Sequence, residues 1–591
     1  MDGLGMNSFI SGLREKRLRA YEASPGDIKE HFGIEQNVLA GGYGYRQVLE
    51  LVQNGADAIL EAYEDGASKD NSPHIEILLS DSCLYAANTG APFSEEGIEA
   101  LLSSHSSPKR GNQIGRFGLG FKSLLRLDGK ITISSGDKSF ELDPDRCRAK
   151  LRDQFGVTDA PGLRLAWEID EVKAQSLQAR FPWATSVVCA EITSGDFLLH
   201  LDHEINQFPV EFLLFLPTSV SLALQNSSEN RRELYRLSEG RELKIHDGQV
   251  ESRWQVIEKV ASISDEEAKN DATHVHSRDE VPLAWAMRID GKREDAGRFW
   301  SFFPTQSLTA IPGILNAPWK LNSDRNAIIP GEWNKALMSE AAKLIADELP
   351  QFIKDDDPGS PLDAFPRQLE RKDEVASHLV EALWTCLKDR AVIPDATGRL
   401  RHAHELWLHP RENKDLAYQW ADVACERKRK RFVHPSCLAR PRGGRLKALA
   451  ERLKSQDSTS NSCPNLRNRD PKDWFAGVAS SEISQAIQVL QLVEAFKEDC
   501  KPSEWKRFCS TLKVIACESG RLQTPDKAVL VPREEQLPQG FDPVAKGLCN
   551  DEVSISTPME PPLTTLKEPL YVRPNGSTLS SHFCGCEPPI F

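Results

Sequence analysis

The chain has 591 residues, which is too long for one compact core and predicts about four folding units at roughly 150 residues per domain. Acidic residues outnumber basic ones by 87 to 73, and 40% of the residues are apolar, so a chain-wide cationic surface for nucleic acid and wholesale disorder are both disfavoured. The sequence has neither the apolar segment of a signal peptide nor an apolar run of about 18 residues, which predicts a cytoplasmic protein outside the membrane. The 13 cysteines lack regular spacing, which predicts free thiols.

The first 200 residues alternate helical and strand patterns. Between residues 45 and 62, apolar side chains recur at intervals of three and four, which predicts a helix with one buried face. A polar stretch at residues 103–113 predicts a loop. These patterns predict an α+β fold, in which helices lie on one face of a mostly antiparallel sheet. We expect helices over 45–62, 95–102 and 115–127, and strands over 74–79, 83–87 and 130–134.

The rest of the chain divides less clearly. We expect a second domain over residues 201–350, a linker in the acidic, proline-rich stretch at 351–366, and a C-terminal region over 367–591. In that region, residues 392–410 align without a gap on residues 514–532, with seven identical positions. A strand, a glycine turn and a second strand would explain the shared pattern, so we predict two copies of a small α/β module. The alternative is a chance similarity.

Three polar residues, Glu50, Asn54 and Asp57, occupy positions i, i+4 and i+7 of the helix expected over 45–62, so their side chains share one stripe. A carboxylate beside an amide is what water activation next to a magnesium-bound phosphate requires. Glu50 would orient or deprotonate the attacking water, and the Asn54 carbonyl oxygen would complete an octahedral Mg²⁺ shell. The alternative interpretation is a solvated polar face.

Two turns that contain glycine follow this helix. Asn88 and Gly90 lie at the end of a strand, where asparagine before glycine usually marks only a turn. In GRFGLGFKS, Gly115, Gly118 and Gly120 would let backbone N–H groups approach a polyphosphate, and the following helix would present its positive end to the same group. On its own, a GxxGxG pattern is weak evidence for a nucleotide.

Taken together and in this order, these motifs resemble the nucleotide-binding domain of the GHKL, or Bergerat-fold, ATPase family, in particular its heat-shock-chaperone and sacsin-like branch. The helix motif is ELVQNGADA, the adenine motif is NTG, the lid is SSHSSPKRGNQ, and the phosphate-binding turn is GRFGLGFKS. WATSVVCAEI resembles the closing strand, whose threonine reaches the adenine pocket. The resemblance implies a Bergerat-type nucleotide-binding sandwich over residues 1–200, with ATP and Mg²⁺ as cofactors. It implies nucleotide contacts from Asn54, which is also the metal ligand, and from Asp57, Asn88, Gly90, Lys109, Gly115, Gly118, Gly120, Phe121 and Thr185.

The resemblance extends to about residue 335. FPVEFLLFLP and FFPT…LNAPWKLNSDRNAI are similar to the middle domain of chaperone-type members, from which an arginine reaches the ATP site. This implies an α/β middle domain over 201–350, with Arg325 as the γ-phosphate contact. A guanidinium delivered from a second domain would neutralise charge on the transferring phosphoryl group, so catalysis would depend on domain closure. Alternatively, Arg325 is a surface residue that pairs with Asp324 or a neighbour.

Asn88 departs from the family pattern, which commonly has aspartate at this position to accept a hydrogen bond from the adenine amino group. The Asn88 carbonyl can accept the same bond, but its amide can also donate to an oxygen such as that of guanine. The base specificity therefore stays open. Lys109 and Lys122 are candidates for phosphate contact, and the alternative is that both are solvated.

Basic residues at 427–454 form a candidate surface for nucleic acid or for a partner, and the alternative is a solvated helix face. The leading expectation is a slow Mg²⁺-dependent ATPase of chaperone or sacsin type, which acts as a nucleotide-driven switch in chaperoning or in a bacterial defence system. Its C-terminal repeats would recruit a protein client or partner, and a homodimer is one expected assembly. The alternatives are a nucleic-acid-associated ATPase in the manner of MutL or topoisomerases, and a nucleotide-binding scaffold that does not hydrolyse.

Overall fold

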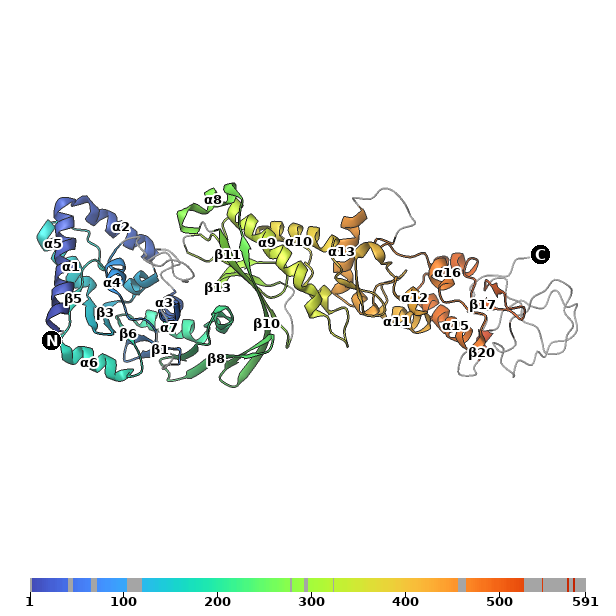
Figure 1. The fold of residues 1–591 in the computed structure, drawn as a ribbon, viewed down its shortest axis with the longest axis horizontal. Coiled ribbons are helices and arrows are strands. Elements are labelled where there is room, and N and C mark those ends of the chain that lie inside the picture. Colours follow the sequence, from blue (N-terminus) through green and yellow to red (C-terminus); the bar gives the residue numbers. More distant parts are fainter. Residues whose placement is uncertain are drawn as a thin grey trace, which may run out of the picture. The chain divides into compact units, whose positions relative to one another are not determined.

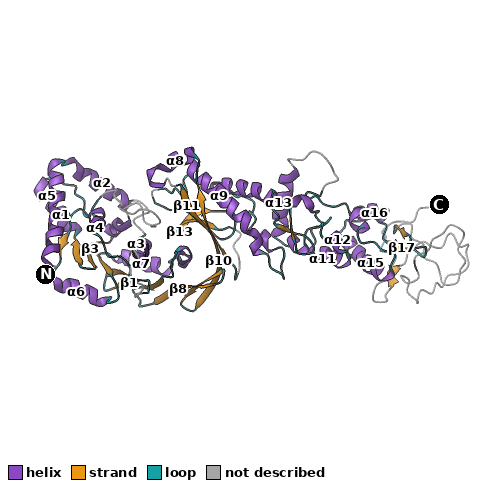
Figure 2. Ribbon diagram, in the orientation of Figure 1, coloured by secondary structure: helices purple, strands orange, loops and turns teal. Residues whose placement is uncertain are grey.

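The chain forms a mixed α+β structure that separates into two compact units (Figures 1 and 2). The first unit comprises residues 1–341 with 369–379, and the second comprises residues 342–368 with 380–591. Within the described part of the chain, no helix has the length and apolar character needed to cross a bilayer. The computed structural model describes residues 3–40, 46–64, 72–103, 120–276, 279–291, 296–322, 324–454 and 464–525, with 545, 571–572 and 578–579.

One large sheet organises the first unit. It has 14 strands in the order β13-β12-β14-β11-β10-β9-β8-β7-β1-β2-β6-β3-β4-β5. The β1–β7 and β12–β14 pairs are parallel and the other pairs are antiparallel, which confirms the expectation of a mostly antiparallel sheet. The strands are β1 (His74–Ser80), β2 (Cys83–Asn88), β3 (Asp128–Ser135), β4 (Lys138–Leu142), β5 (Trp167–Glu168), β6 (Ser186–Ile192), β7 (Ser221–Gln225), β8 (Arg231–Glu239), β9 (Glu242–Asp247), β10 (Val250–Ser262), β11 (Glu280–Arg288), β12 (Arg298–Ser301), β13 (Phe303–Leu308) and β14 (Ile314–Asn316).

Most of the sheet's helices belong to the N-terminal part of the first unit. Helices α9 (Glu332–Glu348) and α10 (Ser377–Lys388) contribute to both units. The remaining helices of the first unit are α1 (Gly3–Ala23), α2 (Gly26–Ala40), α3 (Gln47–Glu64), α4 (Glu95–Leu101), η2 (Gly120–Leu127), α5 (Pro144–Phe155), α6 (Glu171–Arg180), α7 (Gly195–Asn206), η3 (Val210–Phe215), α8 (Glu266–His276) and η6 (Arg371–Ala376).

The ranges expected as two domains, 1–200 and 201–350, share this sheet. They meet where β1 pairs in parallel with β7, over five aligned positions from His74↔Ser221 to Leu78↔Gln225. Beside this junction, the Arg231 guanidinium of β8 forms two hydrogen bonds to the Glu76 carboxylate of β1. We call the β1-to-β5 side of the junction the nucleotide half, and the β7-to-β13 side the middle half.

Helices cover both faces of the nucleotide half. Leu84 and Ala86 of β2 lie in the main core with α3, whereas Tyr85 and Ala87 pack with Leu177 of α6. Alternate residues of a strand point to opposite faces, so α3 and α6 lie on opposite sides of the sheet. The expectation that helices lie on one face is therefore wrong for α6. Helix α6 is short and polar, and Leu177 is its one buried residue, so its sequence lacks the apolar periodicity that would have predicted a helix packed on the sheet.

Of two local predictions for the nucleotide half, one agrees with the structure and one differs from it. The pair Asp81 and Ser82 between the two expected strands predicts a tight hairpin turn, and the two residues adopt φ values of 54° and 58° between β1 and β2. Residues 120–127 form a 3₁₀ helix rather than the α-helix that would present aligned N–H groups to a phosphate. The glycine-rich approach to this element lies outside the described residues.

Both repeats of the second unit contain the expected strand, glycine turn and second strand. β15 (Ile393–Pro394) pairs with β16 (Leu400–Arg401), and β17 (Ile515–Ala516) pairs with β18 (Leu522–Gln523). Gly398 and Gly520 occupy the equivalent turn position with φ of 84° and 80°, a conformation that a Cβ atom would strain. The carbonyls of Pro394 and Ala516 each accept a hydrogen bond from a distant segment, through the backbone N–H of His434 and Ala545.

The remaining helices of the second unit surround these hairpins. One apolar cluster of this unit contains Trp420 and Trp474, whose rings stack, together with Phe496. The elements are η4 (Leu349–Phe352), η5 (Ser360–Ala364), η7 (Ala403–Glu405), α11 (Lys414–Val423), α12 (Glu426–Arg429), η8 (Pro435–Leu438), α13 (Arg442–Lys454), α14 (Pro471–Ala476), α15 (Ile483–Glu498) and α16 (Pro502–Cys509), with a further strand pair β19 (Tyr571–Val572) and β20 (Thr578–Leu579).

The segment expected as a linker, residues 351–366, is packed into the second unit. Leu362 is fully buried, and the Arg442 guanidinium forms paired hydrogen bonds of 2.6–2.7 Å to the carboxylates of Asp357 and Asp363. Proline and acidic residues gave this segment the composition of a linker, but its acidic side chains serve here as partners for a buried arginine.

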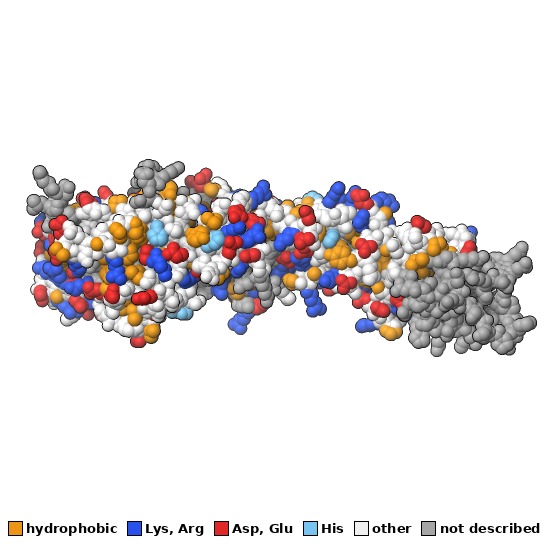
Figure 3. All heavy atoms as spheres, turned by 90° about the horizontal axis from the view of Figure 1, so that it is seen from below, with side chains coloured by type: hydrophobic (Ala, Val, Ile, Leu, Met, Phe, Trp, Pro, Cys, Tyr) orange, Lys and Arg blue, Asp and Glu red, His pale blue; other side chains and the backbone are white. Residues whose placement is uncertain are grey.

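The basic block at 427–454 is paired in part within the second unit. Lys430 pairs with Glu426, Lys447 with Glu412, and Arg452 with Glu381, while Arg445 donates to the carbonyls of Leu362 and Asp363. On the face of the molecule shown in Figure 3, basic and acidic side chains are interspersed. The ion pairs reduce the net positive charge that the block presents.

Candidate functional site

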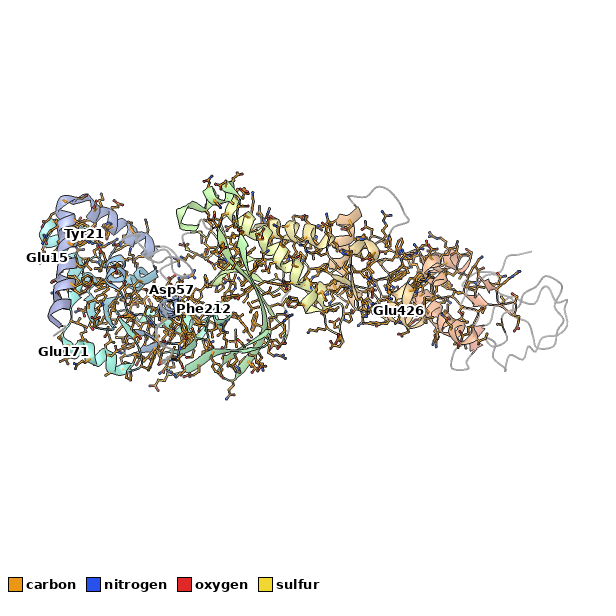
Figure 4. The ribbon with its side chains drawn as sticks, viewed as in Figure 1. Glu15, Tyr21, Asp57, Glu171, Phe212 and Glu426 are labelled. Atoms are coloured by element: carbon orange, nitrogen blue, oxygen red, sulfur yellow. The ribbon has the colours of Figure 1, made fainter. Side chains whose placement is uncertain are left out.

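The polar stripe predicted on one helix lies on α3 and is buried. Glu50 and Asp57 are 4% and 2% exposed, and Asn54, one turn after Glu50, is half-buried; Figure 4 labels Asp57 on this helix. The apolar residues that alternate with them, including Val48 and Val52, are in the core. The interpretation of a solvated polar face is therefore wrong, because buried carboxylates need specific partners.

Arg325 of the middle half is one of these partners. Its Nη1 lies 3.3 Å from Oε1 of Glu50, and the two side chains are only 15% and 5% exposed. The residues are 275 positions apart in the sequence. Arg325 is therefore not a surface residue paired with Asp324; it meets the predicted catalytic carboxylate inside the first unit.

The loop that carries Arg325 has a defined shape. Leu321 and Ile328 form an antiparallel bridge at its base, and the side-chain oxygen of Asn322 accepts hydrogen bonds from the backbone N–H groups of Asn326 and Ala327. Arg325 itself adopts φ of 54°, a left-handed conformation that is unfavourable for a residue with a side chain. The loop therefore places one arginine at its tip under backbone strain.

A second arginine holds this tip from the nucleotide half. Arg46 immediately precedes α3, and its Nη1 donates to the carbonyl oxygens of Asp324 at 3.4 Å and Arg325 at 3.1 Å. The sequence pattern did not identify Arg46, although its position four residues before Glu50 places both on the same side of the helix start.

The predicted adenine motif is fixed against α3. The backbone N–H of Ala91 donates to the carbonyl of Ala58, and a Cβ atom at Gly90 would lie 2.6 Å from the Ala58 backbone. With φ of 112°, Gly90 is a position where glycine is required. The NTG turn thus depends on glycine for its close approach to the helix that carries Glu50.

Asn88 and Thr185 are neighbours at the start of this turn. The Thr185 backbone N–H donates to the Asn88 carbonyl oxygen at 2.9 Å, and Asn88 lies opposite Ser186 in the β2–β6 pair. The Asn88 side-chain N–H donates to the Thr89 carbonyl at 2.8 Å. That bond uses one of the two N–H donors of the amide, so Asn88 can still offer a ligand either its side-chain oxygen or its second N–H.

The phosphate-binding turn is described only from Gly120 onward. Lys109, Gly115 and Gly118 lie outside the described residues, and Phe121 packs against the main core. The Gln47 side-chain amide of α3 donates to the Ser123 carbonyl of η2 at 3.0 Å. This bond joins the start of the helix that bears Glu50 to the element that follows the glycine turn.

Lys122 points into the protein rather than to solvent. It is fully buried, and its ammonium donates to the Ser103 carbonyl at 2.7 Å. Burial, together with the nearby Arg164 guanidinium, lowers the pKa of Lys122 from 10.5 to about 7. The interpretation of a solvated lysine is therefore wrong, and the hydrogen bond to Ser103 gives Lys122 a structural contact at the first residue of the predicted lid.

Arg164 and Glu35 complete what we call the Lys122 cluster: Glu35, Lys122 and Arg164. All three side chains are buried, and Arg164 Nη1 donates to the Leu102 carbonyl at 3.1 Å. Glu35 lies 3.6 Å from Arg164 Nε and accepts hydrogen bonds from the backbone N–H groups of Gly162 and Leu163. One carboxylate therefore faces two buried cationic side chains.

Glu204 is a further buried carboxyl beside α3. It lies on α7, and its Oε1 accepts a hydrogen bond from the Leu49 backbone N–H at 3.1 Å in the first turn of α3. Burial raises the pKa of Glu204 from 4.5 to about 7, although the backbone donors and Arg46 oppose this shift. We call Arg46, Glu50, Glu204 and Arg325 the Glu50 cluster. No local sequence pattern marks Glu204, because its role depends on the packing of α7 against α3.

The donor set suits magnesium bound mainly through phosphate. Within the described residues, no group of three or more histidine, cysteine, aspartate or glutamate side chains could hold a metal ion. A Mg²⁺ ion carried by a nucleotide needs few protein ligands, since phosphates and waters supply the others. The half-buried Asn54 amide, one turn from Glu50, fits that requirement.

Searches of protein-family models and of curated proteins found no match to this chain. The chemistry of the site therefore follows from its residues. Among the predicted residues, the structure brings together Glu50 with Arg325, and Asn88 with Thr185 and Gly90.

Proposed function

We propose that this chain is a Mg²⁺-dependent ATPase of the GHKL type, whose nucleotide state controls the contact between the two halves of its first unit. The observation that carries the proposal is the buried ion pair between Glu50 and Arg325. A carboxylate able to activate water and a guanidinium able to neutralise phosphate meet at one point from sequence positions 275 residues apart.

The ion pair supports a simple exchange of partners. A polyphosphate is a better partner for a guanidinium than one carboxylate, because it offers several charged oxygens for paired hydrogen bonds. When the γ-phosphate binds, Arg325 turns from Glu50 to the phosphate, and the Glu50 carboxylate becomes available to accept a proton. The resting ion pair thus keeps the base occupied until substrate arrives.

Glu50 and Arg325 then divide the chemistry. Glu50 orients a water for in-line attack on the γ-phosphorus and takes its proton, while Arg325 neutralises the negative charge on the equatorial phosphoryl oxygens. Asn54 would supply its carbonyl oxygen to Mg²⁺, which neutralises charge between the β- and γ-phosphates when bound. The bond to the β-phosphate oxygen breaks, and ADP and phosphate leave.

The other end of the site supports adenine as the base. The Asn88 side-chain oxygen can accept a hydrogen bond from a donor such as the adenine amino group, while one amide N–H is bonded to the Thr89 carbonyl. Thr185, held to the Asn88 backbone, and Asp57, on the buried stripe of α3, are the proposed neighbours of that base. The second amide N–H could donate to a guanine oxygen, so competition between ATP and GTP for the full chain is the measurement that decides the base.

The two alternative functions have less support. A nucleic-acid-associated ATPase would use the basic block, but five of its basic residues are paired with acidic residues or carbonyls of the second unit, namely Lys430, Arg442, Arg445, Lys447 and Arg452. A non-hydrolysing scaffold would leave Arg325 away from the site, yet Arg325 contacts Glu50. A conformational switch of chaperone or sacsin type, with a client or partner bound by the C-terminal region, remains the proposal.

The test is Mg²⁺-dependent ATP turnover by the full chain and by Glu50→Ala. Turnover should fall by roughly 10² to 10⁴, as for loss of a general base, while ATP binding is retained. Asn54→Ala should instead weaken binding of Mg–ATP. Glu61→Ala, on the exposed side of the same helix, is the matched control and should turn over ATP like the wild type. Equal turnover by wild type and Glu50→Ala would refute the assignment.

A further inference from the structure

Arg46 has a double role at the start of α3. Its own carbonyl oxygen accepts the hydrogen bond from the Glu50 N–H at 3.0 Å, so its backbone forms the N-cap of the helix. Its side chain leaves the helix and reaches the middle half, where one nitrogen, Nη1, donates to the carbonyls of both Asp324 and Arg325. The residue thereby joins the helix start to a loop 278 and 279 positions away.

The two carbonyls belong to the peptide groups on either side of Arg325, a residue of this loop with a strained backbone conformation. Arg325 has φ of 54°, and the peptide groups on either side of it are the ones that must rotate if the residue relaxes to a negative φ. A donor that holds both carbonyl oxygens opposes that rotation. Arg46 therefore stabilises the conformation that points the Arg325 guanidinium toward Glu50, rather than the guanidinium itself.

Arg46 and Glu50 hold the loop at two points. They stand four residues apart, so at a helix start they face the same side. Arg46 contacts the backbone of the loop tip, and Glu50 contacts its side chain. When phosphate replaces Glu50 as the partner of Arg325, the backbone contact through Arg46 is the one that remains.

We propose that Arg46 is the positioning residue for Arg325, which it keeps in place through the carbonyls of residues 324 and 325 while the guanidinium exchanges Glu50 for the γ-phosphate. This inference rests on the proposed ATPase function. It predicts that Arg46 affects the step in which Arg325 acts and leaves ground-state binding of ADP unchanged, since ADP lacks the phosphate that Arg325 contacts.

The kinetic test is a double-mutant cycle in the full chain. Arg46→Ala should lower kcat roughly 10- to 100-fold, the effect expected from losing two hydrogen bonds that act through a positioned group, and should leave ADP affinity within about twofold. In an Arg325→Ala background the same substitution should lower kcat no further. Arg46→Lys, which keeps a donor for the carbonyls, should recover part of the loss.

Arg236→Ala is the matched control. Like Arg46, Arg236 is a partly buried arginine of the first unit that donates through Nη1 to a backbone carbonyl, that of Leu214, and its Nε has no hydrogen-bond partner among the described residues. It does not contact the 321–328 loop in the described structure. Arg236→Ala should leave kcat close to that of the wild type.

A second measurement separates this inference from the proposed function. Hydrogen–deuterium exchange of residues 321–328 without nucleotide should be faster in Arg46→Ala than in the wild type, and unchanged in Arg236→Ala. Unchanged exchange in Arg46→Ala, or an equal loss of kcat in both backgrounds, would overturn the role of Arg46. If the wild type turns over no ATP, the proposed function fails, and the exchange result alone decides whether Arg46 holds the loop.

Discussion

The Glu50 cluster and the Lys122 cluster both bury charged side chains in the first unit, and they satisfy them in different ways. In the Lys122 cluster, both cations donate to backbone carbonyls of adjacent residues, Ser103 and Leu102, and the single carboxylate caps two backbone N–H groups. In the Glu50 cluster, the central contact is between two side chains, Glu50 and Arg325.

This difference separates a permanent arrangement from an exchangeable one. Backbone carbonyls cannot leave without a local rearrangement of the segment that holds them, so the Lys122 cluster fixes Leu102 and Ser103, where the predicted lid begins. A side-chain ion pair can open when a ligand offers a better partner, at no loss of backbone structure. On the proposed function, the Glu50 cluster is therefore the one of the two in which a ligand would replace a partner.

We expect the largest effect on turnover when the exchangeable contact between Glu50 and Arg325 is removed. Arg325→Ala should lower kcat by roughly 10³ or more, the contribution of an arginine to phosphoryl transfer, and leave ADP affinity almost unchanged. Steady-state turnover and ADP titration of the full chain measure both quantities. Normal turnover would place Arg325 outside the reaction. A chain cut after residue 200 is unsuitable for this test, because it would remove β7 from the edge of β1.

Breaking the permanent contact should instead affect stability. Glu35→Ala leaves Arg164 buried without its carboxylate and two backbone N–H groups without an acceptor, which should cost about 3–5 kcal/mol of unfolding free energy. Denaturant unfolding monitored in the first unit measures this loss. Glu50→Ala should cost less, since the Arg325 side chain is partly exposed and can be hydrated. Equal losses would remove the distinction between the clusters.

The pH dependence of the unfolding free energy should show whether the Lys122 ammonium is buried as the Lys122 cluster requires. Its pKa is about 7 in the folded chain and 10.5 ordinarily, so the unfolded chain binds more protons between these values. Stability contributed by this group therefore rises as the pH rises from 7 to 10.5. Lys122→Met should remove that slope, as measured by urea unfolding at pH 7 and pH 9.5. An identical slope in both proteins would contradict the buried position of the ammonium.

Glu204 should give a smaller slope of opposite sign. Its folded pKa of about 7 lies above the ordinary 4.5, so the folded chain binds more protons between these values, and stability falls as the pH rises through that window. Glu204→Gln keeps an acceptor for the Leu49 N–H and should flatten this fall. Unfolding measured at pH 5 and pH 7.5 checks it, and a steeper fall in the variant would contradict the assignment.

Much of the nucleotide half could be predicted from local patterns. Apolar periodicity located α3, and the spacing of Glu50, Asn54 and Asp57 placed them on one stripe, because helix geometry fixes which residues share a face. The turn at Asp81 and Ser82 followed from residue type. These features depend on neighbours within a few positions in the sequence.

The contacts that complete the site depend on distant residues and could not be predicted in this way. Arg325 was identified only through a resemblance. Arg46 and Glu204 were missed, because contacts between residues far apart in the sequence produce no periodic pattern along the chain. The burial of Lys122 was missed for the same reason, since its partners Ser103 and Arg164 come from other elements. The packed state of residues 351–366 likewise depends on Arg442.

The parallel pairing of β1 with β7 makes the two halves of the first unit a single elastic body. A free hinge between them would have to break a hydrogen-bond ladder of five aligned positions and the contact between Arg231 and Glu76. In the proposed mechanism, a force that bound phosphate exerts on Arg325 would therefore be distributed over many strands as small changes in their twist and bend. If nucleotide binds as proposed, its effect should therefore appear as a change in the curvature of the sheet across the middle half, and not as the rotation of one half about a hinge.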